Sequence, residues 1–82
     1  MEQIARTSKQ LGAAIRRRRR NVRLSQSELG AKTSLRQATI SALENGAPGT
    51  RLRTLVDVMA ALGLEIAIRK RSKASERIED LF

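Results

Sequence analysis

The sequence predicts a mainly α-helical domain of four to five helices, followed by one short C-terminal β-strand. Apolar residues recur at three- and four-residue spacing along most of the chain, and helix-capping residues separate these stretches. Only residues 64–70 alternate apolar and polar side chains in steps of two, as a strand does. With 82 residues, the chain has room for one domain with a modest core.

Composition narrows the possible functions. The formal net charge is +9, from 17 Lys and Arg residues against 8 Asp and Glu residues, and this balance predicts a polyanionic partner. His, Cys and Tyr are absent, so the chain lacks the thiolates and imidazoles that bind metals or act as nucleophiles and bases. We therefore expect no enzyme activity, no catalytic residue, no cofactor and no metal site. No apolar run is long enough for a signal peptide or a membrane span, which predicts a soluble intracellular protein.

The first helix is expected over residues 8–21. Thr7 and Gln10 have the spacing of a capping box, which marks the start of a helix. Residues 1–6 carry no clear signal and are expected either to fray or to add a short edge strand, within an N-terminal arm over residues 1–7. The buried side of the helix is expected to consist of Leu11, Ala14, Ile15 and Val22.

Residues 24–46 predict two short helices around a tight break. Ser25 and Glu28 form a capping box at the start of the first helix. The second helix is expected over residues 37–44, followed by Asn45-Gly46, a usual helix terminator. The apolar residues on the facing sides of the two helices are Leu24, Leu29, Leu35, Ile40 and Leu43. This pattern predicts a helix-turn-helix, which places one helix in the major groove of DNA.

A fourth helix is expected over residues 51–62, with Thr50 as its N-cap and Gly63 as its terminator. Its core-facing residues are expected to be Leu52, Leu55, Val56, Met59 and Leu62. The strand after it would have Leu64, Ile66 and Ile68 on one face. Because a lone strand leaves its backbone groups unpaired, we expect it to pair with the same strand of a second copy in a homodimer. The alternatives are a helix extension or an irregular tail.

The start of the second short helix is the expected DNA-reading surface. Base readout is expected from Arg36, Gln37, Ala38 and Thr39, because Gln can read adenine, Arg can read guanine, and Ala or Thr methyl groups can contact thymine. The alternative is that these residues only cap and solvate the helix. Phosphate contacts are expected from Gln26, Ser27, Lys32, Ser41, Arg16, Arg17 and Arg20. The alternative for Gln26 is that its side chain clamps the next helix.

Residues 16–20 are five successive arginines. Because consecutive residues of a helix are about 100° apart, these side chains point around most of the helix and cannot share one role. The exposed ones are expected to contact phosphates, and the alternative is a solvated charged surface. Arg19 lies four positions after Ile15, at the edge of the buried stripe, so it needs an anionic partner. Glu44 is the expected partner, in a structural ion pair that sets geometry more surely than stability.

The chain resembles the Xre or lambda-repressor-like helix-turn-helix family. The residues that carry the resemblance are Leu24-Ser25-Gln26, Glu28-Leu29, Gln37-Ala38-Thr39-Ile40-Ser41, Leu43-Glu44-Asn45-Gly46, Thr50-Leu52-Leu55 and Ala61-Leu62-Gly63. The resemblance implies a compact bundle of four or five helices that binds operator DNA, and it places Arg19 opposite Glu44. The chain departs from the family pattern at three positions, where Gly30 replaces the usual Ala, Ser34 the usual Gly of the turn, and Arg18 a usually apolar residue.

A narrower resemblance is to HipB-type antitoxins. Residues 37–41 resemble their recognition helix, and residues 62–66 resemble the part that forms their intermolecular sheet. The resemblance implies a repressor that dimerises by strand pairing, binds palindromic operators in its own promoter region and holds a HipA-like kinase toxin. It also implies a cytoplasmic protein that is nucleoid-associated when bound to DNA. The alternatives are a phage-type or stand-alone Xre regulator without a toxin, a protein-sequestering module with incidental DNA affinity, and a nonspecific polybasic binder of RNA or membranes.

The expected division of the chain is an N-terminal arm over residues 1–7, a DNA-binding domain over residues 8–63, a dimerising strand over residues 64–71 and a flexible tail over residues 72–82. The tail is polar, then acidic, and ends in apolar residues. It either remains disordered or becomes ordered on a partner, with Ile78, Leu81 and Phe82 as the expected anchor. Simple fraying is the alternative.

Overall fold

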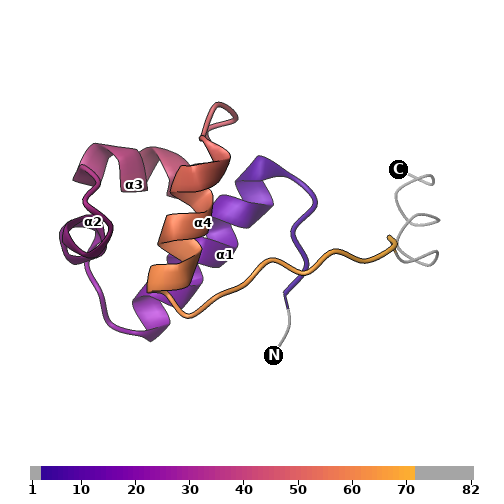
Figure 1. Cartoon of the computed structure of the whole chain (residues 1–82), viewed down its shortest axis with the longest axis horizontal. Helices are drawn as coiled ribbons and strands as arrows, with labels where there is room; N and C mark the ends of the chain where they lie inside the picture. The colour runs from indigo at the N-terminus through magenta and orange to yellow at the C-terminus, as the bar shows by residue number, and fades with distance from the viewer. Residues whose placement is uncertain (1–2, 72–82) are drawn as a thin grey trace.

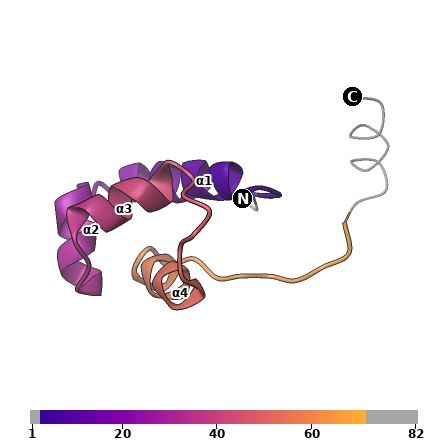
Figure 2. The ribbon, with the colours of Figure 1, turned by 90° about the horizontal axis from the view of Figure 1, so that it is seen from above.

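The structure is a computed structural model, and it describes residues 3–71. It contains four helices within this range: α1 (Ser8–Asn21), α2 (Gln26–Thr33), α3 (Gln37–Glu44) and α4 (Leu52–Ala61) (Figure 1). The helix α3 packs against both α2 and α1, and α4 packs against α2. Seen from above, α1 and α3 lie on one side of the domain and α4 lies on the other (Figure 2). The predicted mainly helical fold is therefore confirmed.

The predicted starts of α1 and α2 have capping hydrogen bonds. At α2 the capping box is complete, because Glu28 N donates to Ser25 Oγ and Ser25 N donates to Glu28 Oε1, both at 3.0 Å. At α1 Gln10 N donates to Thr7 Oγ1 at 3.0 Å. In a standard capping box the Gln10 side chain would accept a hydrogen bond from the backbone N of the N-cap residue, Thr7. Here Gln10 Oε1 instead accepts from the backbone N of Arg6, at 2.7 Å.

The turn between α2 and α3 is made without the usual glycine. Ser34 has φ 58° and ψ 36°, which is the left-handed conformation. An L-residue in this conformation costs about 1 kcal/mol, so the turn keeps its shape at the expense of local strain. Gly30 permits the close approach of the two helices, because a Cβ at this position would lie 2.6 Å from the carbonyl oxygen of Leu35.

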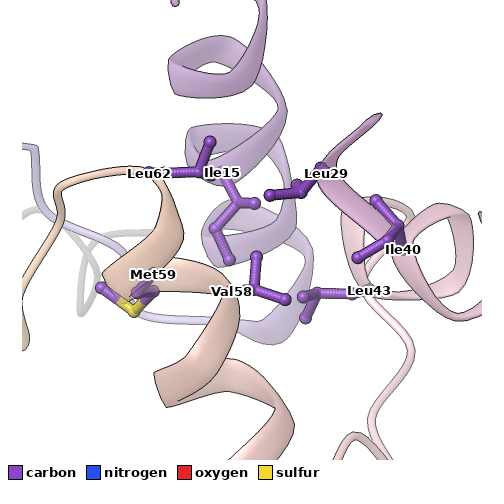
Figure 3. Packing of buried hydrophobic residues seen from close by; sticks show 7 residues of the cluster. All are labelled: Ile15, Leu29, Ile40, Leu43, Val58, Met59 and Leu62. Atoms are coloured by element: carbon purple, nitrogen blue, oxygen red, sulfur yellow. The ribbon is translucent and has the colours of Figure 1, made fainter. Parts of the chain in front are cut away.

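All four helices contribute to one core (Figure 3). The buried hydrophobic residues are Ile15 from α1, Leu29 from α2, Ile40 and Leu43 from α3, and Val58, Met59 and Leu62 from α4 and its C-cap. Partly buried leucines pack around them, among them Leu11, Leu24, Leu35 and Leu55. The five apolar residues predicted for the helix-turn-helix are all in or against this core.

The buried face of α4 differs from the prediction. Leu52 is 69% exposed and Val56 is 46% exposed, whereas Val58 is fully buried. The core contacts therefore come from Leu55, Val58, Met59 and Leu62, which have the i, i+3, i+4, i+7 spacing of one helix face. Val56 lies about 200° from Val58 around the helix axis, so it points away from the core. The predicted burial of Leu52 and Val56 was wrong.

Two smaller predictions were also wrong. The N-cap of α4 is Arg51 and not Thr50, whose hydroxyl donates instead to the carbonyl oxygen of Ala47 at 3.1 Å and closes the turn before the helix. Val22 is 38% exposed, although it was expected on the buried side of α1. It is the C-cap of α1, and the chain turns away at Arg23, which has φ 60°.

The C-terminal segment forms no strand within the described residues. Gly63 ends the helical conformation with φ 70°, and residues 65–71 then run away from the helices as an extended chain (Figure 1). Ile66 is 52% exposed and Ile68 is 97% exposed. A strand is defined by backbone pairing with a neighbour, and no backbone–backbone hydrogen bond joins residues 65–68 to the rest of the described chain. The predicted anchor residues Ile78, Leu81 and Phe82, like residues 1–2 of the N-terminal arm, lie outside the described residues.

Candidate nucleic-acid interface

Three polar side chains meet where the N-terminal ends of α2 and α3 come together. Ser27 Oγ donates to Gln37 Oε1 at 3.1 Å, and Gln37 Nε2 donates to Gln26 Oε1 at 3.5 Å. These two hydrogen bonds orient the amide of Gln37. Because Gln37 is exposed, its amide also remains accessible from solvent. A side-chain amide in this state presents a donor and an acceptor side by side, which is the pattern that pairs with the major-groove edge of adenine.

Gln26 connects this exposed pair to a buried ion pair. Its Nε2 donates to Glu44 Oε1 at 3.2 Å. Arg19 donates to the same carboxylate through Nε, at 2.6 Å from Oε2, and through Nη2, at 2.9 Å from Oε1. The remaining Arg19 Nη1 donates to the carbonyl oxygen of Leu24 at 2.9 Å. A continuous chain of hydrogen bonds therefore runs from Arg19 on α1 to the exposed amide of Gln37.

The contact with Glu44 favours the charged form of Arg19. The hydrogen bond from Arg19 to Glu44 raises the pKa of Arg19 above its already high usual value, against the opposing effect of burial. A guanidinium in a fork-shaped contact with a carboxylate holds both side chains in one orientation. The pair thus fixes the relative placement of α1 and α3 and neutralises the charge of Glu44.

The other residues predicted to contact DNA differ in exposure. Arg36, Ala38 and Lys32 are exposed, whereas Thr39 and Ser41 are half-buried. Two further residues of α3 and its C-cap are exposed on the same face as Ala38, at i+4 and i+7, and these are Ala42 and Asn45. The sequence prediction missed them, although their spacing from Ala38 was a sufficient signal.

The five arginines of α1 separate into three groups. Arg19 pairs with Glu44, and Arg18 donates through Nε to the carbonyl oxygen of Leu62 at 2.9 Å. The exposed group, Arg16, Arg17 and Arg20, lies on the outer side of α1. Together with the side chains that they adjoin, these three line what we call the basic groove: Lys9, Ala13, Arg16, Arg17, Arg20, Asn21, Glu44 and Asn45.

The basic groove lies beside α3 and carries an excess of positive charge. Glu44 is already neutralised by Arg19, and within residues 3–71 no carboxylate forms an ion pair with Lys9 or with the three exposed arginines. Asn45 belongs both to the groove and to the exposed face of α3, so the two surfaces are continuous. The sequence prediction missed Lys9, which lies on the same helix face as Arg16 and Arg20.

Other site types are not seen in this part of the chain. Residues 3–71 contain no group of three His, Cys, Asp or Glu side chains placed to hold a metal ion. Within the same range, no helix is both long enough and apolar enough to cross a membrane. The polar surface at α2 and α3 and the basic groove are therefore the features on which a functional assignment rests.

Comparison with known proteins also identifies a helix-turn-helix in this chain. The family model described as helix-turn-helix matches residues 15–68. A complex of a HipB variant with an O2 20mer is 29% identical, with a TM-score of 0.82, covering 88% of this chain and 100% of that chain. A HipA–HipB–O2–O3 complex and a HipB–O4 20mer complex are each 31% identical, with TM-scores of 0.80 and 0.81, and each covers 87% of this chain and 100% of its own. No curated protein sequence matches the chain.

Proposed function

Because this chain belongs to the Xre-like helix-turn-helix family, we propose that it represses transcription as a homodimer bound to a palindromic operator. The chain is a DNA-binding helix-turn-helix regulator that resembles the HipB antitoxin. The observation that carries the proposal is the exposed Gln37 amide, held by Ser27 and Gln26 at the N-terminal end of α3. The second helix of this motif reads bases through its N-terminal residues, so an oriented amide there is placed for base recognition.

Base recognition is assigned to the first residues of α3 and the residue before it. Gln37 reads an adenine through one donor and one acceptor. Arg36, exposed one position earlier, reaches a guanine, and the exposed Ala38 packs its methyl group against a thymine. Thr39 is half-buried, which leaves it a methyl contact at the edge of the site.

Phosphate contacts surround this reading surface. Gln26 and Ser27 are the first two residues of α2, and the backbone N–H groups at a helix start attract phosphate oxygens. Lys32 and Ser41 lie on α2 and α3, and they extend the contact on either side. The exposed arginines of the basic groove, Arg16, Arg17 and Arg20, supply the electrostatic part of the affinity.

The experiment that tests base reading starts from sites selected by the wild-type protein out of random duplex DNA. Binding of wild type and Gln37→Ala is then measured on the selected site and on each single-base-pair substitution of it. We expect Gln37→Ala to lose about 1–3 kcal/mol of discrimination at one base pair and little elsewhere. Equal weakening on every sequence would make Gln37 a backbone contact. Arg53→Ala, an exposed change on α4, is the matched control.

Dimerisation is assigned to the segment of residues 64–71, which forms the intermolecular strand in this proposal. The support is its alternating pattern, its extended course and the exposure of Ile66 and Ile68 in the single copy. Pairing around a two-fold axis would place two recognition helices about one helical turn of DNA apart, or a multiple of it. Ile66→Pro removes a backbone donor and should abolish the dimer in sedimentation experiments. A dimer of unchanged affinity would move the interface elsewhere.

The proposed protein partner is a HipA-like kinase toxin, which makes this chain the antitoxin of a module that represses its own operon. The likeness to HipB in a HipA–HipB–O2–O3 complex supports this partner. The anchor that we assign to it is the apolar end of the tail, at Ile78, Leu81 and Phe82. Deleting residues 72–82 should abolish binding of a kinase encoded beside this gene and leave operator binding intact. Operator binding with no such partner would indicate a stand-alone regulator.

A further inference from the structure

The side chain of Arg18, a residue of α1, reaches the C-terminal end of α4. The family pattern favours an apolar residue at this position of α1, but here a half-buried guanidinium reaches across to another helix. Its Nε donates to the carbonyl oxygen of Leu62, the C-cap of α4, at 2.9 Å. The last carbonyls of a helix have no partner within it, and a cation at this end also interacts favourably with the helix dipole.

The contact lies at the point where the C-terminal segment leaves the domain. Gly63 follows with φ 70°, and a Cβ on Gly63 would lie 3.4 Å from Arg18 Nη2, so the guanidinium packs directly against this residue. Leu64 N donates to the carbonyl oxygen of Met59 at 2.8 Å. No backbone–backbone hydrogen bond joins residues 65–68 to the described helices. The direction of the segment is therefore set at Leu62–Leu64, and Arg18 is the side chain that holds this junction from α1.

The neighbouring residue on α1 holds the reading helix. Arg19 binds Glu44 at the end of α3, and Arg18 binds Leu62 at the end of α4. Two successive residues of one rigid helix thus tie the DNA-reading surface to the exit of the segment that we assign to the dimer. A change in the angle at this exit would rotate one recognition helix relative to its copy.

We propose that Arg18 is a positioning residue that sets the spacing of the two half-sites read by the dimer, an inference that rests on the proposed strand-paired homodimer. The guanidinium fixes the exit angle of residues 64–71, and through it the separation and rotation of the two copies of α3. The side chain itself touches no DNA. Its loss should therefore change which operator spacing is preferred while the sequence of each half-site stays the same.

The test compares full-length wild type, Arg18→Met and Arg18→Lys on palindromes built from the selected half-site. The centre-to-centre spacing is changed by one base pair in each direction, which rotates one half-site by about 34° relative to the other. Fluorescence anisotropy gives the affinity for each spacing and for a single half-site. Arg18→Met retains the unbranched apolar stem in a position where the family carries apolar residues, and a thermal melt verifies that it folds.

We expect wild type to prefer one spacing by about tenfold. Arg18→Met should reduce this ratio to about threefold or less, or shift the optimum, with unchanged affinity for the single half-site. Arg18→Lys should retain most of the preference, because its ammonium group can still donate to the Leu62 carbonyl. Arg53→Met, which removes an exposed charge from α4, should leave the ratio unaltered.

Two results would overturn the inference and are distinguishable. If Arg18→Met forms the same dimer and keeps the wild-type spacing ratio, the junction is set by other contacts and Arg18 has no positioning role. If wild type itself is monomeric and binds half-sites without a spacing preference, the proposed dimer fails, and the inference fails with it.

Discussion

Arg19 and Glu44 form a bidentate ion pair that joins the C-terminal half of α1 to the last residue of α3. The two contacts are 2.6 Å and 2.9 Å long, and the two residues are only 8% and 6% exposed. Gln26 donates to the same carboxylate and accepts from Gln37, so the pair is the buried end of the hydrogen-bond chain that orients the reading surface. The same two side chains therefore join α1 to α3 and support the residues that we propose for base recognition.

Breaking this ion pair should destabilise the domain strongly. Glu44→Gln or Arg19→Met leaves one charged partner buried without its counter-charge, and we expect each to lower the free energy of unfolding by about 3–5 kcal/mol. The double variant Arg19→Met/Glu44→Gln removes both charges and should recover much of that loss. Urea denaturation measures all three. Additive losses in the double variant would contradict an energetic coupling between the two residues.

A matched control is the exposed pair of Arg53 and Asp57 on α4. Their closest N–O distance is 4.0 Å, and the two side chains are 94% and 55% exposed. Exposed ion pairs of this kind contribute about 0–1 kcal/mol because water and salt screen them. Arg53→Met should therefore change the unfolding free energy little, so that the comparison isolates the effect of burial.

The exposed arginines of the basic groove should set the salt dependence of DNA binding. Each phosphate that a cation neutralises contributes about 0.9 to the slope of log affinity against log salt concentration. Replacing Arg16 and Arg17 by Gln should therefore flatten the slope by up to about 2. Lys9 lines the same groove but was not among the phosphate contacts predicted from the sequence, so Lys9→Gln tests whether it also contributes to the slope.

The control for the salt experiment is Arg53→Gln, which removes one positive charge from α4. It should leave the slope close to that of wild type. An unchanged slope in the Arg16→Gln/Arg17→Gln variant would mean that these two arginines only solvate α1. Measurements on the selected operator and on random duplex then separate the electrostatic part of the affinity from base recognition.

The local signals in the sequence predicted much of this fold, because caps and turns depend on neighbouring residues. The capping box at Ser25 and Glu28 and the terminator at Gly46 appear where expected. The buried face of α4 could not be predicted in the same way. Its apolar residues fit two helical stripes, one through Val56 and one through Val58, and only the positions of the other helices decide between them.

The residues of the candidate site also fall into those that local sequence signals predict and those that depend on how the helices pack. Gln37 and Arg36 follow from the motif itself, since their place at the start of α3 is a local property. The basic groove joins residues of α1 to Asn45 beyond α3, and such a combination exists only after the helices pack. The hydrogen bond from Arg18 on α1 to the Leu62 carbonyl at the end of α4 likewise joins residues 44 positions apart in the sequence.

Gly12 lies where the backbones of α1 and α3 approach each other closely. A Cβ at this position would contact the carbonyl oxygen of Leu43 and would lie 2.7 Å from that of Glu44. Gly12→Ala should therefore destabilise the domain by about 1–3 kcal/mol, although Ala is the better helix former by about 1 kcal/mol. Gly49→Ala is the control, because nothing lies within 4 Å of a Cβ there. A stabilised Gly12→Ala variant would contradict the tight α1–α3 contact.

The start of α2 should make stability depend on pH in the acid range. The backbone N–H of Ser25, and next its hydroxyl, lowers the pKa of Glu28 by hydrogen bonding to its carboxylate. In the unfolded chain a glutamate has a pKa of about 4.3, so the unfolded state binds the proton first as the pH falls. The stabilisation is therefore fully present above about pH 4.3 and is lost as the pH falls through the lower folded pKa.

A double-mutant cycle between Ser25→Ala and Glu28→Gln measures this effect. Glu28→Gln removes the ionised carboxylate, and Ser25→Ala removes the hydroxyl of the N-cap, which alone costs about 1 kcal/mol. Urea midpoints at pH 7 should show coupling between the two changes, because both act on the same capping box. In acid, below the usual glutamate pKa of about 4.3, the coupling should shrink as the carboxylate of the folded state takes up its proton. Equal coupling at both pH values would mean that the ionised form of Glu28 is not what stabilises the helix start.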